Sequence, residues 1–286
     1  MTAAEFIKIL VPITLIEMMV AIGLGVSVAE LAAVARNWRL VAKAAAANYL
    51  LVPVVTVGLL LLFQVADPMV PVGFLILAVC PGAPFAPGCA KLAKGNVATA
   101  VGLMVLLAGS SAIAAPVLLY LLLPLMSGSR TLEVDAAKIV VTLLVTQLAP
   151  LFVGLGVRHW LPGVASRLLR PANLLSAVLN LTTMGVVLVV YFPLMAEIRL
   201  RGYLGMSALL VASLAAGWLL GGPGTDSRKT LALTTSLRNV GVGLIIATGN
   251  FAGTAAVTAV LAYGIFEIIG SLLLALGWGR STSRAI

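Results

Sequence analysis

A group of polar residues interrupts an apolar stretch near the C-terminal end of the chain. Arg238 and Asn239 follow three hydroxyl residues, Thr234, Thr235 and Ser236. An arginine within an apolar span is costly unless it meets water or an anionic partner. If Arg238 merely ended a shorter helix and extended to the membrane surface, the neighbouring amide and hydroxyl groups would have no explanation. We therefore interpret this stretch as a binding site for a charged solute, with Thr234, Thr235, Arg238 and Asn239 as candidate binding residues.

A second interrupted stretch, Cys80–Lys94, reads CPGAPFAPGCAKLAK. Each of its prolines removes a backbone donor and clashes with the preceding turn, so no continuous helix can form. In a bilayer, an opened backbone is tolerated only where protein or a water-filled cavity satisfies the freed polar groups. Two cysteines are too few for a disulfide framework or a metal site, and we interpret them as small apolar residues and expect no bound metal. The candidate binding residues of this stretch are Cys80, Pro81, Gly82, Ala86, Pro87 and Gly88.

The composition defines the class of protein that carries these two stretches. Of the 286 residues, 62% are hydrophobic and 9% are charged, and the mean hydropathy is +1.16. Long apolar runs without the alternation of a membrane barrel predict an all-α protein of several membrane-spanning helices. The net charge of +9 does not indicate nucleic-acid binding, because the basic residues lie in short links between apolar runs and form no cluster.

We expect nine transmembrane helices, of which the third and the eighth are broken. The basic residues of the links place the N-terminus outside and the C-terminus in the cytoplasm. Between the fifth and sixth spans, segment 159–170 alternates apolar and basic residues and is expected to lie along the membrane interface. The approximate spans are 6–28, 41–65, a broken helix within 68–92, 97–125, 139–157, 174–195, 203–220, a broken helix within 231–251, and 255–278.

The two broken helices run in opposite directions and are separated by four spans. This arrangement is what an inverted repeat requires, and paired broken helices in two halves of a chain are typical of transporters. We predict that residues 80–88 cross residues 234–243 near the membrane centre. The whole chain, 1–286, is then one transporter domain with halves at 1–126 and 138–279.

Two carboxylates also lie within predicted spans, Glu17 and Glu267. Ionisable groups inside a membrane are functional candidates by default, although a structural hydrogen bond is the plain alternative. We expect one of the two to exchange a proton during transport. Asn180, Thr182 and Thr183, in the sixth span, are expected to line the interface between the two halves of the helix bundle or to form hydrogen bonds between helices.

These motifs together resemble the bile acid:sodium symporter family. The CPG of Cys80–Gly82 followed by the AKGNVA of Ala93–Ala98 is similar to the first crossover helix of that family, and the LALTTSLRNVG of Leu231–Gly241 is similar to the second. Supporting matches are GLGV at Gly23–Val26, NYLLVP at Asn48–Pro53 and IGSLLLA at Ile269–Ala275. The resemblance implies ten helices in two inverted halves, arranged as a panel domain and a core domain, of which this chain lacks the first helix. It also implies alternating access for organic anions coupled to sodium.

The sodium sites that the resemblance implies carry few suitable side chains here. Only Asn48, where the family has glutamine, and Thr234, where it has glutamate, keep an oxygen. An arginine, which offers no acceptor, stands at position 238. The positions that match the family's sodium ligands on the crossover helices and the following helix are Ala86, Pro87, Ala100, Met104, Thr234 and Arg238. We therefore predict that no cofactor is required and that sodium coupling, which the family implies, is lost or altered.

The sequence favours a secondary transporter of small organic anions, integral to the lipid bilayer of a bacterial inner membrane, with no nucleic-acid partner. An enzyme would need a convergent nucleophile, base or metal ligands, and the single histidine, His159, is expected at the interface. A channel or a non-transporting sensor on the same fold remains the alternative. Saturable solute counterflow separates transport from both alternatives.

Overall fold

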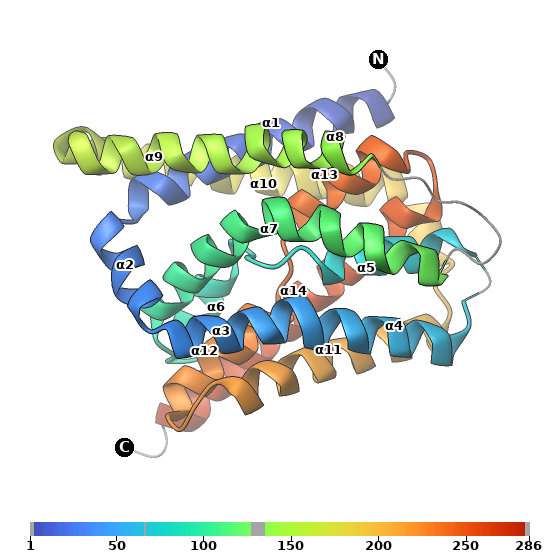
Figure 1. The fold of residues 1–286 in the computed structure, drawn as a ribbon. Helices are drawn as coiled ribbons and strands as arrows, with labels where there is room; N and C mark the ends of the chain where they lie inside the picture. The colour runs from blue at the N-terminus through green and yellow to red at the C-terminus, as the bar shows by residue number, and fades with distance from the viewer. Residues whose placement is uncertain (1–2, 66, 127–134, 284–286) are drawn as a thin grey trace.

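The computed structural model describes residues 3–65, 67–126 and 135–283, which form a bundle of helices (Figure 1). In chain order the elements are α1 (Ala3–Gly25), α2 (Val28–Arg36), α3 (Trp38–Ala46), η1 (Ala47–Leu51), α4 (Val52–Phe63), α5 (Met69–Ala78), α6 (Ala86–Leu92), α7 (Val97–Met126), α8 (Ala136–Leu143), η2 (Leu144–Leu148), α9 (Ala149–Trp160), α10 (Pro162–Ala196), α11 (Leu200–Leu220), α12 (Thr225–Ser236), α13 (Val240–Asn250) and α14 (Ala255–Ser283). The elements η1 and η2 are π-helical turns that join α3 to α4 and α8 to α9.

Within these described ranges, eight helical segments are long and apolar enough to cross a membrane. They are Glu5–Gly25, Trp38–Phe63, Val97–Met126, Ala136–Trp160, Pro162–Ala196, Leu200–Leu220, Thr225–Asn250 and Ala255–Ser281. The shorter apolar helix α5, counted together with α6, forms the first broken helix. With this broken helix, the described residues contain the nine spans that the sequence predicted. This confirms an all-α membrane protein.

The helices form two groups. α1, α9 and α10 pack against one another as a layer, which lies at the top of Figure 1 together with α8. α1 and α9 approach closely because Gly23 faces α9 and Gly154 faces α1. A Cβ atom at Gly23 would collide with the carbonyl oxygen of Leu151, and one at Gly154 would collide with that of Val20. Small residues at such contacts let membrane helices pack by backbone-to-backbone approach.

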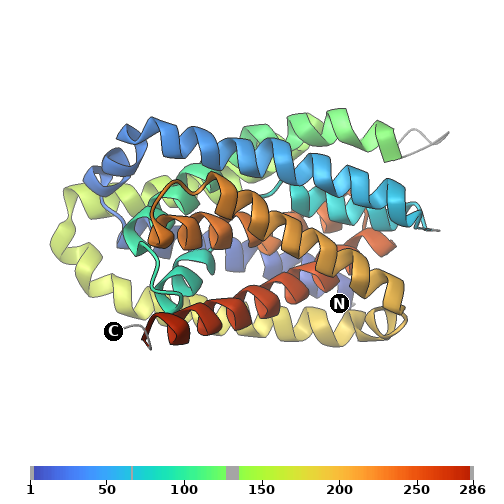
Figure 2. The same ribbon diagram turned by 90° about the horizontal axis from the view of Figure 1, so that it is seen from below.

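The second group contains both broken helices. α11 packs on α4 and α12, and α14 packs on α5 (Figure 2). The second broken helix, Thr225–Asn250, is the most buried of the eight long spans, whereas Pro162–Ala196 is the least buried. The interrupted backbone therefore lies inside protein, where its freed polar groups can find partners.

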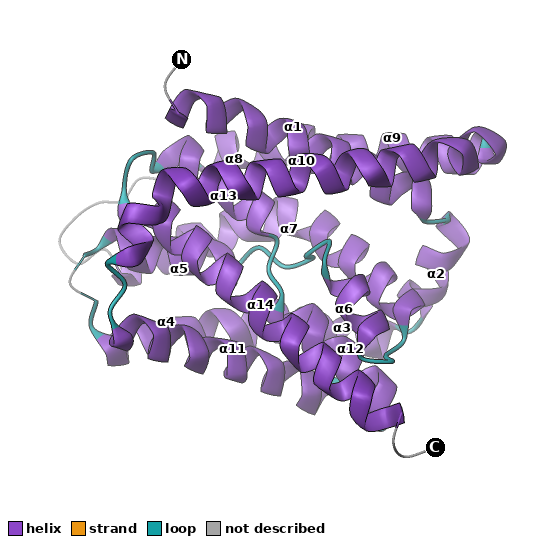
Figure 3. Cartoon of the chain, turned by 180° about the vertical axis from the view of Figure 1, so that it is seen from behind, coloured by secondary structure: helices purple, strands orange, loops and turns teal. Residues whose placement is uncertain are grey.

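The two predicted interruptions are confirmed. α5 ends at Ala78 and α6 begins at Ala86, while α12 ends at Ser236 and α13 begins at Val240. Figure 3 shows the loops of both breaks in the middle of the bundle, beside α14 and α6. In the first break Gly82 has a φ of 85°, in the left-handed region that glycine adopts without strain. In the second, Leu237 is extended, with φ −89° and ψ 126°.

One link differs from the sequence prediction, and another lies partly outside the described residues. Segment 159–170 is not a separate element, because α9 continues to Trp160 and α10 begins at Pro162 and runs 35 residues to Ala196. Proline is well suited to the first turn of a helix, where its missing amide has no partner to lose. The polar link expected between the fourth and fifth spans includes residues 127–134, which lie outside the described residues.

The short helix α2 was not predicted. It is fixed by a capping box in which the Ser27 hydroxyl accepts a hydrogen bond from the Glu30 amide at 3.2 Å. The Glu30 carboxylate in turn accepts one from the Ser27 amide at 2.8 Å. These bonds stabilise the charged form, and the pKa of Glu30 is lowered, chiefly by the Ser27 amide. The Ser-x-x-Glu spacing is the signature that would have revealed this helix.

Candidate functional site

Asn239 joins the two broken helices where they cross. Its backbone amide donates a hydrogen bond to the carbonyl oxygen of Cys80 at 2.8 Å, and its side-chain amide donates to that of Gly82 at 3.4 Å. Its side-chain oxygen accepts a bond from the Val242 amide at 3.2 Å and so caps the start of α13. One residue therefore satisfies freed groups in both breaks. The predicted crossing of residues 80–88 with residues 234–243 is present.

Arg238 lies at the adjoining ends of two half-helices. Its side chain is 2% exposed, and its guanidinium donates to the carbonyl oxygens of Thr235 at 2.5 Å and Ala78 at 3.4 Å. Ala78 is the last residue of α5, and Thr235 lies in the last turn of α12. The last carbonyls of a helix have no partner within it and carry the negative end of the helix dipole. The guanidinium is thus a fixed cation at two negative helix ends.

Glu267, from α14, shares this buried site. One carboxylate oxygen accepts a hydrogen bond from the backbone amide of Arg238 at 2.6 Å, and the other is buried without a hydrogen-bond partner. Glu267 is 0% exposed. Within the described ranges its carboxylate forms no direct ion pair with the guanidinium, although both groups belong to the same residue cluster. Tyr263, one turn earlier on α14, has a buried hydroxyl that also lacks a partner.

Asn48 reaches the same cluster from the π-helical turn η1. Its side-chain amide donates to the carbonyl oxygen of Ala44 at 2.8 Å and to the hydroxyl of Thr235 at 3.4 Å. Its side-chain oxygen is buried and has no partner. Single π-helical turns in membrane helices often mark functional sites. Asn48, Thr235, Arg238, Asn239 and Glu267 therefore form one buried polar cluster around the crossing, which we name the crossing cluster.

The remaining predicted residues are placed around or away from this cluster. Cys80, Pro81 and Gly82 are buried within the first break, and Ala86 is buried at the start of α6. Pro87 is half-buried and Gly88 is exposed, so neither belongs to the crossing cluster. The Thr234 hydroxyl bonds back to the carbonyl oxygen of Thr230 at 3.0 Å within its own helix.

Glu17 is not brought to the crossing cluster. It lies on α1, half-buried, and accepts a hydrogen bond from the Ser176 hydroxyl of α10 at 2.6 Å. The same pair of helices is joined by the hydroxyls of Thr14 and Thr183, 2.7 Å apart. Asn180, also on α10, donates to the sulfur of Met18 at 3.8 Å. The predicted hydrogen bonds of Asn180 and Thr183 to a neighbouring helix are thus present.

Two polar groups near the cluster were missed from the sequence. Gln147, in η2, donates to the carbonyl oxygen of Ala108 and to the Ser111 hydroxyl, and its own side-chain oxygen is buried without a partner. Ser271 on α14 pairs with Ser236 at 3.0 Å. The signal for Gln147 was present, because TQLAP repeats the pattern of NYLLVP: an amide a few residues before a proline in an apolar span.

A small cavity lies where the crossing faces the α1–α10 layer. Its volume is about 40 Å³, and its lining includes Pro84 and Phe85 from the first break, Arg238 and Asn239 from the second, and Thr183 from α10. Sites for organic ligands usually have volumes of about 300–1,000 Å³. An organic solute therefore cannot occupy this cavity unless the two groups of helices separate.

The side chains at the positions that the family resemblance matches to sodium ligands offer few oxygen atoms. Ala100 and Met104 are buried on α7, and Ala86 is buried at the start of α6, so these positions offer no side-chain oxygen. The Thr234 hydroxyl is already bonded within α12. The Arg238 guanidinium occupies the carbonyl ends of α5 and α12, and transporters with broken helices commonly coordinate sodium at such half-helix ends.

Gly82 supplies a direct test of the crossing geometry. Its φ of 85° is strained for any other residue, and a Cβ atom would lie 2.5 Å from the backbone nitrogen of Ala108. Gly82→Ala should therefore destabilise the protein by about 1–3 kcal/mol, measured by thermal unfolding in detergent. Gly88→Ala is the matched control, because nothing lies within 4 Å of a Cβ atom there. Equal unfolding temperatures for the two variants would contradict the described crossing.

Two broken helices that cross inside a membrane bundle are typical of secondary transporters. Residues 12–198 match the model of the Sodium Bile acid symporter family. The chain belongs to that family, and it is a transporter and not an enzyme.

Curated relatives cover most of the chain. It is 26% identical to "Uncharacterized sodium-dependent transporter YocS" of Bacillus subtilis (strain 168), over 83% of this chain and 73% of the relative. It is 23% identical to "Probable sodium/metabolite cotransporter BASS2, chloroplastic" of Oryza sativa subsp. japonica, over 91% of this chain and 62% of the relative. The chain thus spans less than two thirds of the rice protein.

Proposed function

We propose that this chain transports small organic anions by alternating access at the crossing of its two broken helices. The observation that carries the proposal is the buried Arg238, fixed at the joined ends of α5 and α12. Its charge, together with the start of α13, creates a positive centre beside the small cavity. An anion that enters between the two groups of helices would meet this centre.

Alternating access follows from the grouping of the helices. We assign α1, α8, α9 and α10 to the panel domain and the helices around the crossing to the core domain, with halves at 1–126 and 138–279 related as an inverted repeat. The two domains meet at the small cavity, which Thr14 and Thr183 line from the panel domain and Arg238 and Asn239 line from the core domain. Movement of one domain against the other would enlarge the 40 Å³ cavity from one side of the membrane at a time.

The position of Arg238 also bears on whether transport is coupled to a sodium gradient. The guanidinium takes the place and the charge of a coupling cation, but it cannot dissociate and therefore cannot carry the energy of a sodium gradient. One relative is named a sodium-dependent transporter and the other a probable sodium/metabolite cotransporter, yet the oxygen ligands that sodium would need are missing here. We propose transport that is independent of sodium: facilitated, exchange-type or linked to protons.

Counterflow in proteoliposomes tests the transport proposal. Vesicles loaded with an unlabelled organic anion should accumulate the labelled anion transiently, and the accumulation should saturate. An open channel gives no such overshoot, and a non-transporting sensor gives no uptake. If a broad panel of organic anions produced no counterflow, the proposal would be wrong.

Glu267 is the carboxylate that we expect to exchange a proton. It lies in the crossing cluster with a free oxygen, and Arg238 and Tyr263 are the ionisable groups beside it. If transport is proton-linked, uptake should rise as the external pH falls, because protonation neutralises this carboxylate from the outside. Glu267→Gln should abolish that rise. Glu17→Gln is the control and should keep it, since Glu17 bonds to Ser176 away from the crossing; a variant Glu267→Gln with the wild-type pH profile would exclude this role.

We also propose that the protein lies in a bacterial inner membrane with its N-terminus outside. The end of α1 that begins the described chain and the end of α14 lie at opposite ends of the bundle (Figure 1). This placement supports an odd number of crossings. The basic links then fall on the cytoplasmic side.

A further inference from the structure

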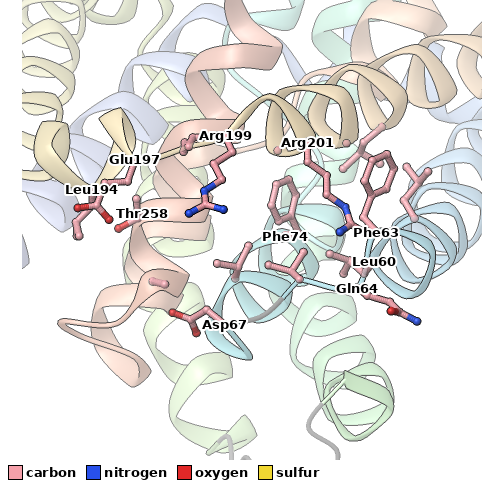
Figure 4. Close-up of a pocket in the computed structure, with 18 of the residues that line it drawn as sticks. Leu60, Phe63, Gln64, Asp67, Phe74, Leu194, Glu197, Arg199, Arg201 and Thr258 are labelled. Carbon is pink, nitrogen blue, oxygen red and sulfur yellow. The ribbon is translucent and has the colours of Figure 1, made fainter.

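A second cavity lies outside the crossing cluster. It has a volume of about 820 Å³ and opens where α4 gives way to α5 and where α10 gives way to α11 (Figure 4). It shares no lining residue with the small cavity beside Arg238. Its size is within the range of organic ligand sites. Nothing in the proposed transport cycle uses it.

Four charged side chains surround this cavity: Asp67, Glu197, Arg199 and Arg201. Figure 4 shows the guanidinium of Arg199 extending into the hollow beside Thr258, while Arg201 lies next to Phe63 and Asp67 lies across the opening. Asp67 accepts one hydrogen bond, from the Met69 amide at 2.8 Å. No ion pair joins these four groups to one another or to other residues of the described chain. Two positive and two negative groups are therefore available to a ligand.

A buried hydroxyl marks the floor of the cavity. Thr258, in the first turns of α14, is 8% exposed, and its hydroxyl has no hydrogen-bond partner. A buried polar group without a partner costs free energy. In Figure 4 this residue lies beside Arg199, so a ligand atom held by that guanidinium could also accept a bond from the Thr258 hydroxyl.

The opposite wall is apolar. Leu60 and Phe63 from α4 face Phe74 from α5 across the cavity (Figure 4). α4 ends and α5 begins at this end of the bundle, where membrane spans meet the polar boundary of the bilayer. A ligand that matches the cavity therefore has both charges in its head and an apolar chain attached to it.

We propose that this cavity binds a zwitterionic amphiphile. Its anionic group, a phosphate or carboxylate, lies between Arg199 and Arg201 and accepts a hydrogen bond from the Thr258 hydroxyl. Its ammonium group lies toward Asp67 and Glu197, and its apolar chain covers Leu60, Phe63 and Phe74. Phosphatidylethanolamine of the surrounding bilayer has this chemistry, and so does a water-soluble short-chain phosphoethanolamine.

Native mass spectrometry of the full chain in a maltoside detergent tests the proposal. Phosphatidylethanolamine should bind about tenfold more tightly than phosphatidylglycerol with the same acyl chains, because the latter has no ammonium group. Competition with dihexanoyl phosphatidylethanolamine, which is soluble in water, distinguishes the sources. If the short-chain lipid displaces the long-chain lipid fully at a similar concentration, the ligand is a soluble molecule. If the long-chain lipid is retained, the ligand comes from the bilayer.

Paired variants identify the groups. Arg199→Gln with Arg201→Gln should weaken phosphatidylethanolamine binding about tenfold. Asp67→Asn with Glu197→Gln should remove the preference over phosphatidylglycerol. Arg167→Gln with Arg170→Gln, at the other end of α10, should leave binding unchanged. All of the substituted side chains are exposed, so the variants should fold.

Equal binding of the two lipids by the wild-type chain would overturn the proposal. The proposal would also be overturned if the control variant Arg167→Gln with Arg170→Gln lost as much phosphatidylethanolamine binding as Arg199→Gln with Arg201→Gln. The readout is binding and does not involve transport, so its outcome is independent of whether the crossing cluster transports an anion.

Discussion

Replacing Arg238 with methionine should abolish transport and lower the free energy of unfolding by about 3–5 kcal/mol, the range for breaking a buried charged network by removing one partner. The substitution leaves the carbonyl oxygens of Ala78 and Thr235 without their donor. It also removes the positive charge nearest to the buried carboxylate of Glu267, whose bond to the backbone amide of residue 238 stays in place. Methionine has a similar length, so lost packing contributes little.

Thermal unfolding and counterflow on the same preparations check this expectation. Arg228→Met is the matched control, because Arg228 also donates to a backbone carbonyl, that of Gly222 at 2.7 Å, but lies in the first turn of α12, away from the crossing. Arg238→Lys keeps the charge with a different geometry and should retain part of the stability. An Arg238→Met protein that is as stable and active as Arg228→Met would show that the guanidinium does not hold the half-helices together.

The second prediction with a large effect is a gain of sodium dependence. Thr234→Glu combined with Arg238→Gln removes the fixed cation and adds a carboxylate and an amide oxygen beside the free side-chain oxygen of Asn48. The carbonyl oxygens of Ala78 and Thr235 are released at the same time. Oxygen ligands at half-helix ends are those that coordinate sodium in broken-helix transporters. Uptake by this double variant should therefore become stimulated by sodium.

The matched control is Thr234→Glu alone. It keeps the guanidinium in place, so sodium should have no effect on its uptake. Ala86 and Pro87 still leave the first sodium site incomplete, and the stimulation should be about tenfold at most, within the usual range of coupling between sites. A double variant that folds, transports and ignores sodium would contradict the role assigned to position 238.

The sequence predicted the architecture well because its strongest signals are local. Prolines and glycines in Cys80–Lys94 forbid a continuous helix whatever surrounds them, and Arg238 beside Asn239 is costly in any apolar span. The structure interrupts the chain at both places. The family resemblance, which the match over residues 12–198 confirms, depended on the same two stretches.

The partners of these residues could not be predicted in the same way. Arg238 bonds to two backbone carbonyls and not to a side chain, and a backbone carbonyl leaves no mark in a sequence. The choice between Glu17 and Glu267 likewise depended on long-range packing: one bonds to Ser176 of α10 and the other to the amide of Arg238. The length of α10 was missed because the basic residues before position 171 resemble an interfacial segment, although Pro162 can begin a helix.

The central claim is that Arg238 acts as a fixed cation in place of sodium. Uptake of a labelled organic anion into proteoliposomes, with all sodium replaced by choline, tests this most directly. The wild-type rate should be unchanged by the replacement. A collapse of wild-type uptake in choline would show that the protein needs sodium and that the guanidinium does not take its place.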